Sequence, residues 1–116
     1  MTLVSIFHIA EQPVWNAAKT ESTYRVASLN DEGFIHLSTR SQFVLTASRY
    51  YRGRTDLVLL EVDEVRLPDG ALRYESSTND ELFPHLYAEL PVNAVIRVHM
   101  FGPDDEGLFA VPSTVE

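Results

Sequence analysis

Three histidines are the residues whose types and positions best suit chemistry in this sequence: His8, His36 and His85. An imidazole changes charge near neutral pH, so it can hold a ligand hydroxyl or move a proton at a reacting centre. His8 and His36 each lie near the end of a predicted strand, where a side chain is held firmly beside an open loop. His85 lies in a segment predicted to be irregular, and such segments often line sites. The three positions therefore predict one ligand cleft.

Simpler interpretations exist for these histidines and for the fourth one. His8 follows apolar residues on its face, which is typical of a hydrogen-bonded core histidine. His99 lies on the polar face of a late predicted strand beside Arg97, so we expect it at the surface. Three imidazoles can hold zinc with an open fourth position, but no pair here has the short spacing that makes such a site specific. We expect no metal, and a tri-histidine metal enzyme is the least favoured alternative.

Several catalytic chemistries are excluded because the sequence lacks the residues or motifs that they require. It has no cysteine, which excludes disulfides, thiolate nucleophiles and cysteine-bound metals. It also has no Gly-x-Ser-x-Gly nucleophile elbow, no phosphate-binding loop and no dinucleotide fingerprint. Catalysis must therefore rest on histidine, arginine, carboxylate, hydroxyl or tyrosine side chains. Glu61 and Glu81 are candidate general acids or bases, although a surface or capping carboxylate is the commoner outcome.

The charge distribution bears on the kind of ligand. A formal net charge of −8 argues against a DNA partner and makes RNA an unexpected one, because such proteins carry an excess of lysine and arginine. Within fifteen positions, however, the sequence gathers four arginines, Arg40, Arg49, Arg52 and Arg54. A local positive patch on an acidic protein suits a small phosphorylated ligand. The alternative is a solvated helix face that balances nearby carboxylates.

The segment around His36 shows how the chain could position this side chain. Residues 34–38 alternate as a strand and run directly into a predicted helix. Thr39 and Gln42 have the spacing of a capping box, and Phe43 begins an inward helical stripe that Gly53 ends. His36 is therefore predicted at the end of a strand, just before a helix.

The remaining elements predict an α+β domain. Strands are expected at residues 3–9, 56–62, 72–75 and 94–100, with a last edge strand at 107–111, and a short helix through Lys19 buries Val14, Ala17 and Ala18. The strand at 56–62 is apolar on both faces and therefore central. Glu61 lies on one of those faces and must find a partner or open to a cleft. Pro84 argues against a regular central strand at 82–87.

We expect one domain spanning residues 1–116, with a core at about 3–100 and a loosely held C-terminal extension at 101–116. No segment approaches the roughly 20 apolar residues of a membrane span, and no targeting signal is recognised, so a cytoplasmic location is the default expectation. The sequence leaves the oligomeric state and the physiological role open.

Four ordered motifs resemble one family, the small bacterial proteins called domain of unknown function family 952. The motifs are Ile6-Phe7-His8, residues 32–39 (EGFIHLST), residues 56–63 (DLVLLEVD) and residues 81–87 (ELFPHLY) followed by Leu90-Pro91. This family is grouped with the ADP-ribosyltransferase-like fold. The resemblance implies a split β-sandwich of two small sheets with flanking helices and a cleft between the sheets.

The resemblance also implies roles for individual residues. Phe7-His8 is similar to the first-strand histidine that contacts the ribose of NAD in ADP-ribosyltransferases, and residues 35–38 resemble the His-Leu-Ser segment of RNA 2′-phosphotransferases. NAD or an NAD-derived nucleotide would then contact His8, His36, Ser38, Arg40 and Arg49.

The catalytic residues would be His36, His85 and Glu61, although no motif fixes the carboxylate. The activity implied is ribosyl or phosphoryl transfer, or glycosidic cleavage. The alternative is a binding module for a nucleotide-like ligand without chemistry.

Overall fold

Two almost wholly apolar segments form neighbouring strands of the main sheet. The computed structural model describes residues 5–76 and 80–116. Strand β1 (Ser5–Glu11) pairs antiparallel with β4 (Leu57–Asp63), and β4 pairs antiparallel with β8 (Val95–Phe101). Every residue of β4 is buried, which confirms the prediction that this strand is central.

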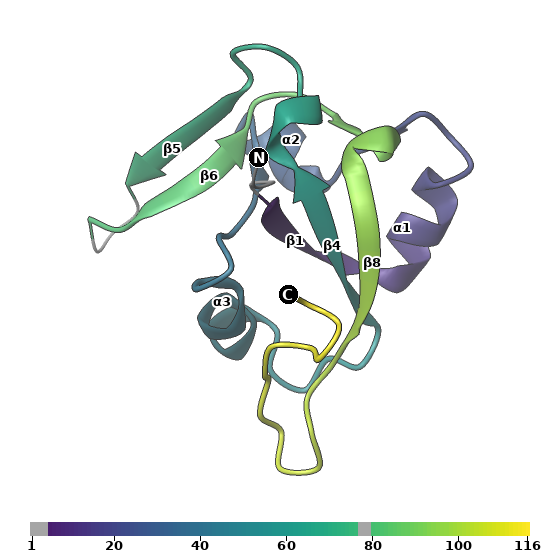
Figure 1. Cartoon of the computed structure of the whole chain (residues 1–116), viewed down its shortest axis with the longest axis vertical. Helices are drawn as coiled ribbons and strands as arrows, with labels where there is room; N and C mark the ends of the chain where they lie inside the picture. The colour runs from purple at the N-terminus through teal and green to yellow at the C-terminus, as the bar shows by residue number, and fades with distance from the viewer. Residues whose placement is uncertain (1–4, 77–79) are drawn as a thin grey trace.

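Two smaller antiparallel sheets complete the strand architecture of the described residues. Strand β2 (Thr23–Tyr24) pairs with β7 (Leu90–Pro91). Strands β3 (Ile35–His36), β6 (Leu82–Leu86) and β5 (Leu72–Ser76) form the third sheet in the order β3-β6-β5. The α+β class is confirmed, with three small sheets where two were expected. The β5–β6 hairpin extends away from the main sheet (Figure 1).

Short helices fill the connections. Helix α1 (Gln12–Ala18) follows β1, α2 (Ala27–Asp31) precedes β3, and α3 (Phe43–Tyr50) precedes β4. Two 3-10 turns, η1 (Glu64–Arg66) and η2 (Val92–Ala94), follow β4 and β7. Among the described residues, no helix has both the length and the apolar character needed to cross a membrane.

The predicted inward stripe of α1 is corrected. The helix buries Trp15 and Ala18, whereas Val14 and Ala17 are exposed. Trp15 packs beside Tyr24, with their ring centroids 6.0 Å apart. Because a tryptophan removes far more apolar surface from water than an alanine, the helix turns toward it.

Apolar side chains cover both faces of the main sheet. One face packs against the other two sheets in a first core that includes Leu60, Ile35 and Leu86. The opposite face packs under α3 in a second core that includes Phe7 and Phe43, whose ring centroids lie 4.9 Å apart. The main chains of Phe7 and Ser38 exchange two hydrogen bonds of 2.7 Å, which join β1 to the chain leaving β3.

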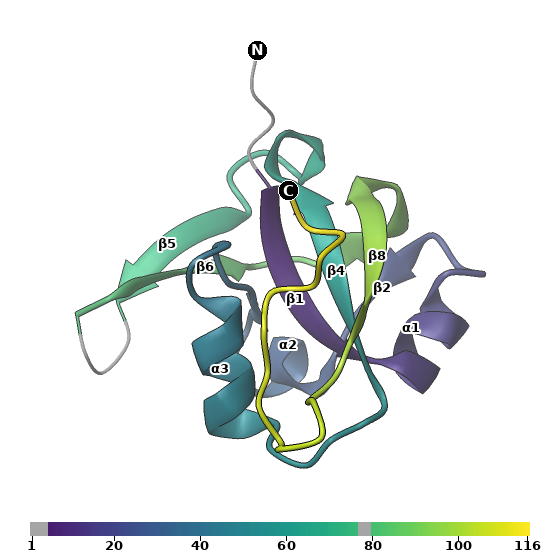
Figure 2. The same cartoon turned by 60° about the horizontal axis from the view of Figure 1, so that its bottom comes forward.

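The C-terminal segment belongs to the second core, and the prediction of a loose tail is wrong. Phe109 and Val115 are buried there, while residues 107–111 form no strand. Figure 2 shows this segment running over the sheet between α3 and β8. It also covers His99, which is 2% exposed rather than at the surface. The apolar residues Val98 and Met100, on the other face of β8, are the exposed ones.

The prediction against a regular central strand around Pro84 is also wrong, because β6 is the middle strand of its sheet. In an antiparallel ladder, the N and C=O groups of one residue point toward the same neighbour. The Pro84 carbonyl accepts a hydrogen bond from the Leu37 N–H at 3.0 Å, beyond the end of β3. The position where Pro84 lacks an N–H therefore faces the chain beyond the end of β3. The hydrogen bonds between β6 and β5 are not affected.

The predicted capping box at α3 is formed in part. The Gln42 side chain accepts a hydrogen bond from the Thr39 N–H at 2.9 Å, as expected. The Thr39 hydroxyl, however, contacts Ser41 at 3.2 Å instead of capping the helix, which begins only at Phe43. The Gln42 amide donates to Glu81 and to the Leu82 carbonyl, so it ties the start of α3 to β6.

Candidate functional site

His8 is a buried side chain whose two ring nitrogens both have partners inside the protein. Its Nδ1 lies 2.7 Å from the carbonyl oxygen of His36, and its Nε2 lies 2.8 Å from the hydroxyl of Tyr24. A carbonyl can only accept, so Nδ1 carries the hydrogen and Nε2 accepts from the tyrosine. Burial lowers the pKa of His8 from 6.5 to about 4, which keeps the ring neutral. In this structure His8 is a hydrogen-bonded core residue.

His36 and His85 stand together on the outer face of the β3-β6-β5 sheet. They are directly opposite in the antiparallel register, and their ring centroids are 5.5 Å apart. Their neighbours Ile35 and Leu86 point the other way, into the first core. His8 lies on the core side, so the three imidazoles do not converge on one cleft. The structure brings together two of the three predicted histidines.

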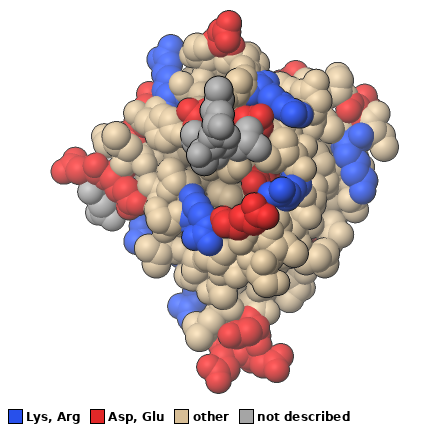
Figure 3. All heavy atoms as spheres, viewed as in Figure 1, with Lys and Arg blue, Asp and Glu red and all other residues tan. Residues whose placement is uncertain are grey.

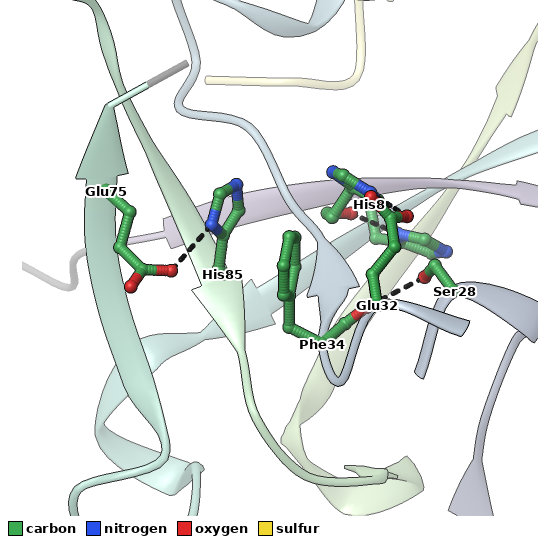
Figure 4. Close-up of polar contacts among 7 residues, drawn as sticks. His8, Ser28, Glu32, Phe34, Glu75 and His85 are labelled. Carbon is green, nitrogen blue, oxygen red and sulfur yellow. Dashed lines mark hydrogen bonds and ion pairs between the residues drawn. The ribbon is translucent and has the colours of Figure 1, made fainter. Parts of the chain in front are cut away.

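His85 is held by a carboxylate that sequence reasoning did not identify. The Nδ1–H of His85 donates to Oε1 of Glu75 at 2.8 Å, and the Tyr87 hydroxyl donates to the same oxygen at 2.6 Å. These hydrogen bonds, that of Tyr87 first, lower the pKa of the Glu75 carboxyl. The bond to Glu75 in turn raises the pKa of Tyr87. No described residue hydrogen-bonds to the second ring nitrogen of His85, which points away from Glu75 in Figure 4.

Aromatic rings surround the paired imidazoles. Phe34 stacks on the His85 ring with centroids 4.0 Å apart and an interplanar angle of 21°. The Phe34 ring also lies 5.2 Å from that of Tyr87. Arg73, opposite His85 in the register with β5, places its guanidinium 5.0 Å from the centre of the Tyr87 ring. These contacts restrict the rotation of His85 and leave a cation beside it.

His36 has a carboxylate partner of its own. Its Nε2 lies 2.8 Å from Oε2 of Glu32, and both side chains are about half exposed. Glu32 is the C-cap of α2, and Gly33 follows with a φ of 91°, a left-handed conformation that favours glycine and turns the chain into β3. The Ser28 hydroxyl donates to the Phe34 carbonyl at 2.8 Å, which fastens α2 to this turn (Figure 4).

We call this surface the histidine face. It consists of seven residues from α2, β3, β5 and β6 and their ends, namely Glu32, Phe34, His36, Arg73, Glu75, His85 and Tyr87. Two hollows in the described part of the chain lie elsewhere, one lined by residues between Met100 and Pro112 and the other by residues between Glu64 and Tyr74. None of the seven residues lines either hollow, and the two histidines differ in exposure: the His36 side chain is about half exposed, whereas that of His85 is 11% exposed.

Other predicted site residues lie apart from the histidine face. Ser38 is buried, with its hydroxyl 3.5 Å from that of Thr46 in α3. Arg40 donates to the carbonyl of Glu116 at 2.9 Å, and Arg49 is exposed in the last turn of α3. Glu61 lies on the opposite face of the main sheet from His8, because it is opposite Phe7 in the register.

The four arginines do not form one free cationic patch. Arg54 is bound by Asp56 and Glu11, with contacts of 2.8 and 2.6 Å, and these carboxylates raise its pKa. On the surface seen in Figure 3, basic and acidic side chains are interspersed, and acidic ones cluster at the lower tip.

The residues that sequence reasoning missed are Glu75, Arg73, Tyr87, Phe34 and Glu32. A usable signal was present, since Phe83, His85 and Tyr87 alternate as one face of a strand. Because Pro84 was interpreted as a strand breaker, this alternation was not recognised as a strand. Among residues 5–76 and 80–116, no three histidine, aspartate or glutamate side chains gather in a way that could hold a metal ion.

The fold and this surface define a small α+β protein with two histidine–carboxylate pairs on one sheet face. The chain belongs to the family described as protein of unknown function (DUF952), whose model matches residues 9–98. The resemblance to that family is thereby confirmed.

Solved structures similar to the chain include protein CC0527 from Caulobacter crescentus. Its crystal structure shares 36% sequence identity, with a TM-score of 0.83 over 91% of this chain and 93% of that chain. A solution NMR structure of CC0527 shares 37% identity, with a TM-score of 0.77 over 90% of each chain. A search of curated proteins found no match.

Proposed function

We propose that the protein is an enzyme that cleaves or transfers the glycosidic bond of an NAD-like ribosyl compound on the histidine face. The observation that carries the proposal is the anionic Glu75 carboxylate held beside His85. When the bond between a ribose carbon and nicotinamide breaks, positive charge develops on the sugar, and a fixed carboxylate stabilises that charge.

Glu75 meets the requirements for this role. Oε1 receives hydrogen bonds from Tyr87 and His85, whereas Oε2 has no hydrogen-bond partner among the described residues. Because those bonds lower the carboxyl pKa, Glu75 stays ionised at neutral and mildly acidic pH. The free oxygen is therefore available to a cationic sugar.

His85 can supply the base for the second half of the reaction. Glu75 fixes the hydrogen on Nδ1, so a neutral ring carries its lone pair on Nε2. This nitrogen can take a proton from the attacking water as its oxygen bonds to the ribose carbon and nicotinamide departs. With NAD and water as reactants, the products are ADP-ribose and nicotinamide, and one proton is released.

Other groups on the face suit the remaining parts of such a ligand. Phe34 and Tyr87 offer aromatic surface for a planar ring, and Arg73 offers a guanidinium for a phosphate. His36, half exposed beside Glu32, would hydrogen-bond a ribose hydroxyl. The same features would serve a binding module that lacks the chemistry, and the experiment below separates the two.

The direct test incubates the protein with NAD and measures nicotinamide release by chromatography, beside a melting-temperature scan with NAD, ADP-ribose and zinc. Glu75→Gln keeps the bulk of the side chain but removes its charge, and we expect a rate about 100-fold lower. Glu106→Gln, an exposed residue in the turn after β8, is the matched control and should leave the rate unchanged.

Each result has a separate meaning. Nicotinamide release that depends on Glu75 supports the enzyme. A melting shift with ADP-ribose and no release would leave only the binding module, because a ligand stabilises the state that binds it. Neither release nor a shift with either nucleotide would overturn the proposal, and a shift with zinc alone would favour a metal site instead.

A further inference from the structure

A second histidine–carboxylate cluster lies on the far side of the main sheet and has no part in the proposed function. Its central residue is His99, whose Nε2 lies 2.8 Å from Oε1 of Glu61. The other ring nitrogen, Nδ1, lies 2.6 Å from the hydroxyl oxygen of Thr114. Strands β4 and β8 and the C-terminal segment that follows β8 therefore meet in one chain of hydrogen bonds.

The direction of these bonds follows from the chemistry of the partners. An ionised carboxylate can only accept, so Nε2 of His99 carries the hydrogen and donates it to Glu61. In the neutral ring, Nδ1 is then an acceptor, and it receives the hydrogen of the Thr114 hydroxyl. The carboxylate thus fixes the tautomer that leaves a basic nitrogen on the threonine oxygen, which is the arrangement of an activated hydroxyl nucleophile.

Two members of this chain of groups are buried, and the third is exposed. The side chains of His99 and Glu61 are 1% and 7% exposed, whereas Thr114 is an exposed residue. Glu61 is compensated in its buried position, because its Oε2 accepts from the Ser5 hydroxyl at 2.9 Å and lies 3.7 Å from Arg97. The base and its carboxylate are fixed inside the protein, and the hydroxyl they act on belongs to an exposed residue.

We propose that Thr114 is a nucleophile that accepts an acyl group, with His99 as its general base and Glu61 as the group that orients the base. The Thr114 oxygen bonds to the carbonyl carbon of an ester while its proton moves to Nδ1 of His99. The ester C–O bond then breaks, and the leaving alcohol takes that proton. Water, deprotonated by His99 in turn, releases the acid and restores the threonine.

The exposed position of Thr114 decides the first substrates to test. A hollow of about 220 Å³ lined by Met100, Leu108 and Pro112 contains neither His99 nor Thr114, so it does not define the acyl group. Small activated esters need no shaped acyl pocket to reach an exposed residue, and they are therefore the substrates to test.

The experiment measures acylation with p-nitrophenyl acetate as the probe. We expect p-nitrophenol release above the buffer rate, together with an acetyl group that peptide mass spectrometry locates on Thr114. Thr114→Val should abolish this label, whereas Thr114→Ser, which keeps the hydroxyl, should retain it. Thr55→Val, a change at another exposed threonine, is the matched control and should behave like the wild type.

His99→Asn should slow acetylation of Thr114 by about 100-fold, since general-base catalysis contributes at least that much. Circular dichroism of each variant checks that the fold is kept, and Thr114→Ser shows whether loss of the label follows the hydroxyl or the fold. The proposal is overturned if the acetyl group is found only on lysines, serines or the N-terminus, if Thr114→Val labels like the wild type, or if no protein-dependent reaction occurs. None of these outcomes bears on nicotinamide release, so the two proposals fail independently.

Discussion

Acid should destabilise this protein through one buried side chain, His8. Its ring is neutral in the folded state, with a pKa lowered by burial to about 4, whereas the same ring in the unfolded chain titrates near 6.5. Between these values the unfolded state binds a proton that the folded state does not. The free energy of unfolding therefore rises with pH up to 6.5, and it falls as the pH drops from 6.5 toward 4.

The size of the effect follows from the two pKa values. Each pH unit in this window changes the free energy of unfolding by about 1.36 kcal/mol per proton. The interval from 6.5 down to 5 spans about 1.5 units, so the contribution of His8 falls by about 2 kcal/mol over that range. Because the ring is buried, screening by solvent takes little from this estimate.

The assay is urea unfolding at about pH 7 and pH 5 for the wild type and for His8→Asn. Asparagine keeps an N–H near the position of Nδ1, so it can still donate to the His36 carbonyl, but it does not titrate. We expect the wild type to lose about 2 kcal/mol more than the variant between the two pH values. Equal losses in both proteins, or an NMR titration of His8 with a midpoint near 6.5, would refute the reasoning.

Further predictions concern packing and hydrogen bonding. Tyr24→Phe leaves the Nε2 of His8 without a donor and should lower the free energy of unfolding by about 1–3 kcal/mol in urea titrations, with no loss if the bond is unimportant. Phe109→Ala should cost about 3–5 kcal/mol, because it opens a cavity in the second core, whereas the exposed Leu108→Ala should cost less than about 0.5 kcal/mol. Equal effects of these two alanine changes would contradict the packing of the C-terminal segment. Trp15→Ala should lower the free energy of unfolding by about 3–5 kcal/mol in the same assay, more than Val14→Ala does. A larger loss for Val14→Ala would support the inward stripe predicted from the sequence.

Local sequence patterns were sufficient for the central parts of the fold. Residues 56–62 are apolar on both faces, and such a run is buried wherever the chain places it, so β4 could be identified without knowing its partners. The strand-to-helix path around His36 could also be predicted, because the turn at Gly33 and the residues from Thr39 to Phe43 act over short distances.

Long-range pairing accounts for what the sequence did not reveal. His99, on the polar side of β8, is buried because Glu61 and Thr114 bind both of its ring nitrogens, whereas Arg97 on the same side is exposed. Alternation alone would place both residues in solvent. The contact of His85 with Glu75 depends on the register of β5 with β6, which no local pattern specifies. The prediction for Pro84 assumed that both neighbouring strands pair with β6 along its whole length, whereas β3 ends before it is opposite Pro84.

The candidate site was predictable to the same extent. His36 and His85 were singled out by their residue type and by their motifs, and the structure places them on one face. His8 was expected on the same cleft, but the Tyr24 hydroxyl and the His36 carbonyl take both of its ring nitrogens. A strand-end histidine can face a core as readily as a ligand, and only the packing above the strand decides which.

The most direct test of the central claim follows the imidazole resonances of the four histidines by NMR while ADP-ribose is added. The histidine face predicts that the signals of His36 and His85 shift in a saturable way, with those of His8 and His99 unchanged. Arg73→Gln, which removes the guanidinium proposed to bind a phosphate, should weaken these shifts, and Glu106→Gln should not. Shifts confined to His8 or His99, or no saturable shift at His36 and His85, would contradict the claim that this face is the ligand site.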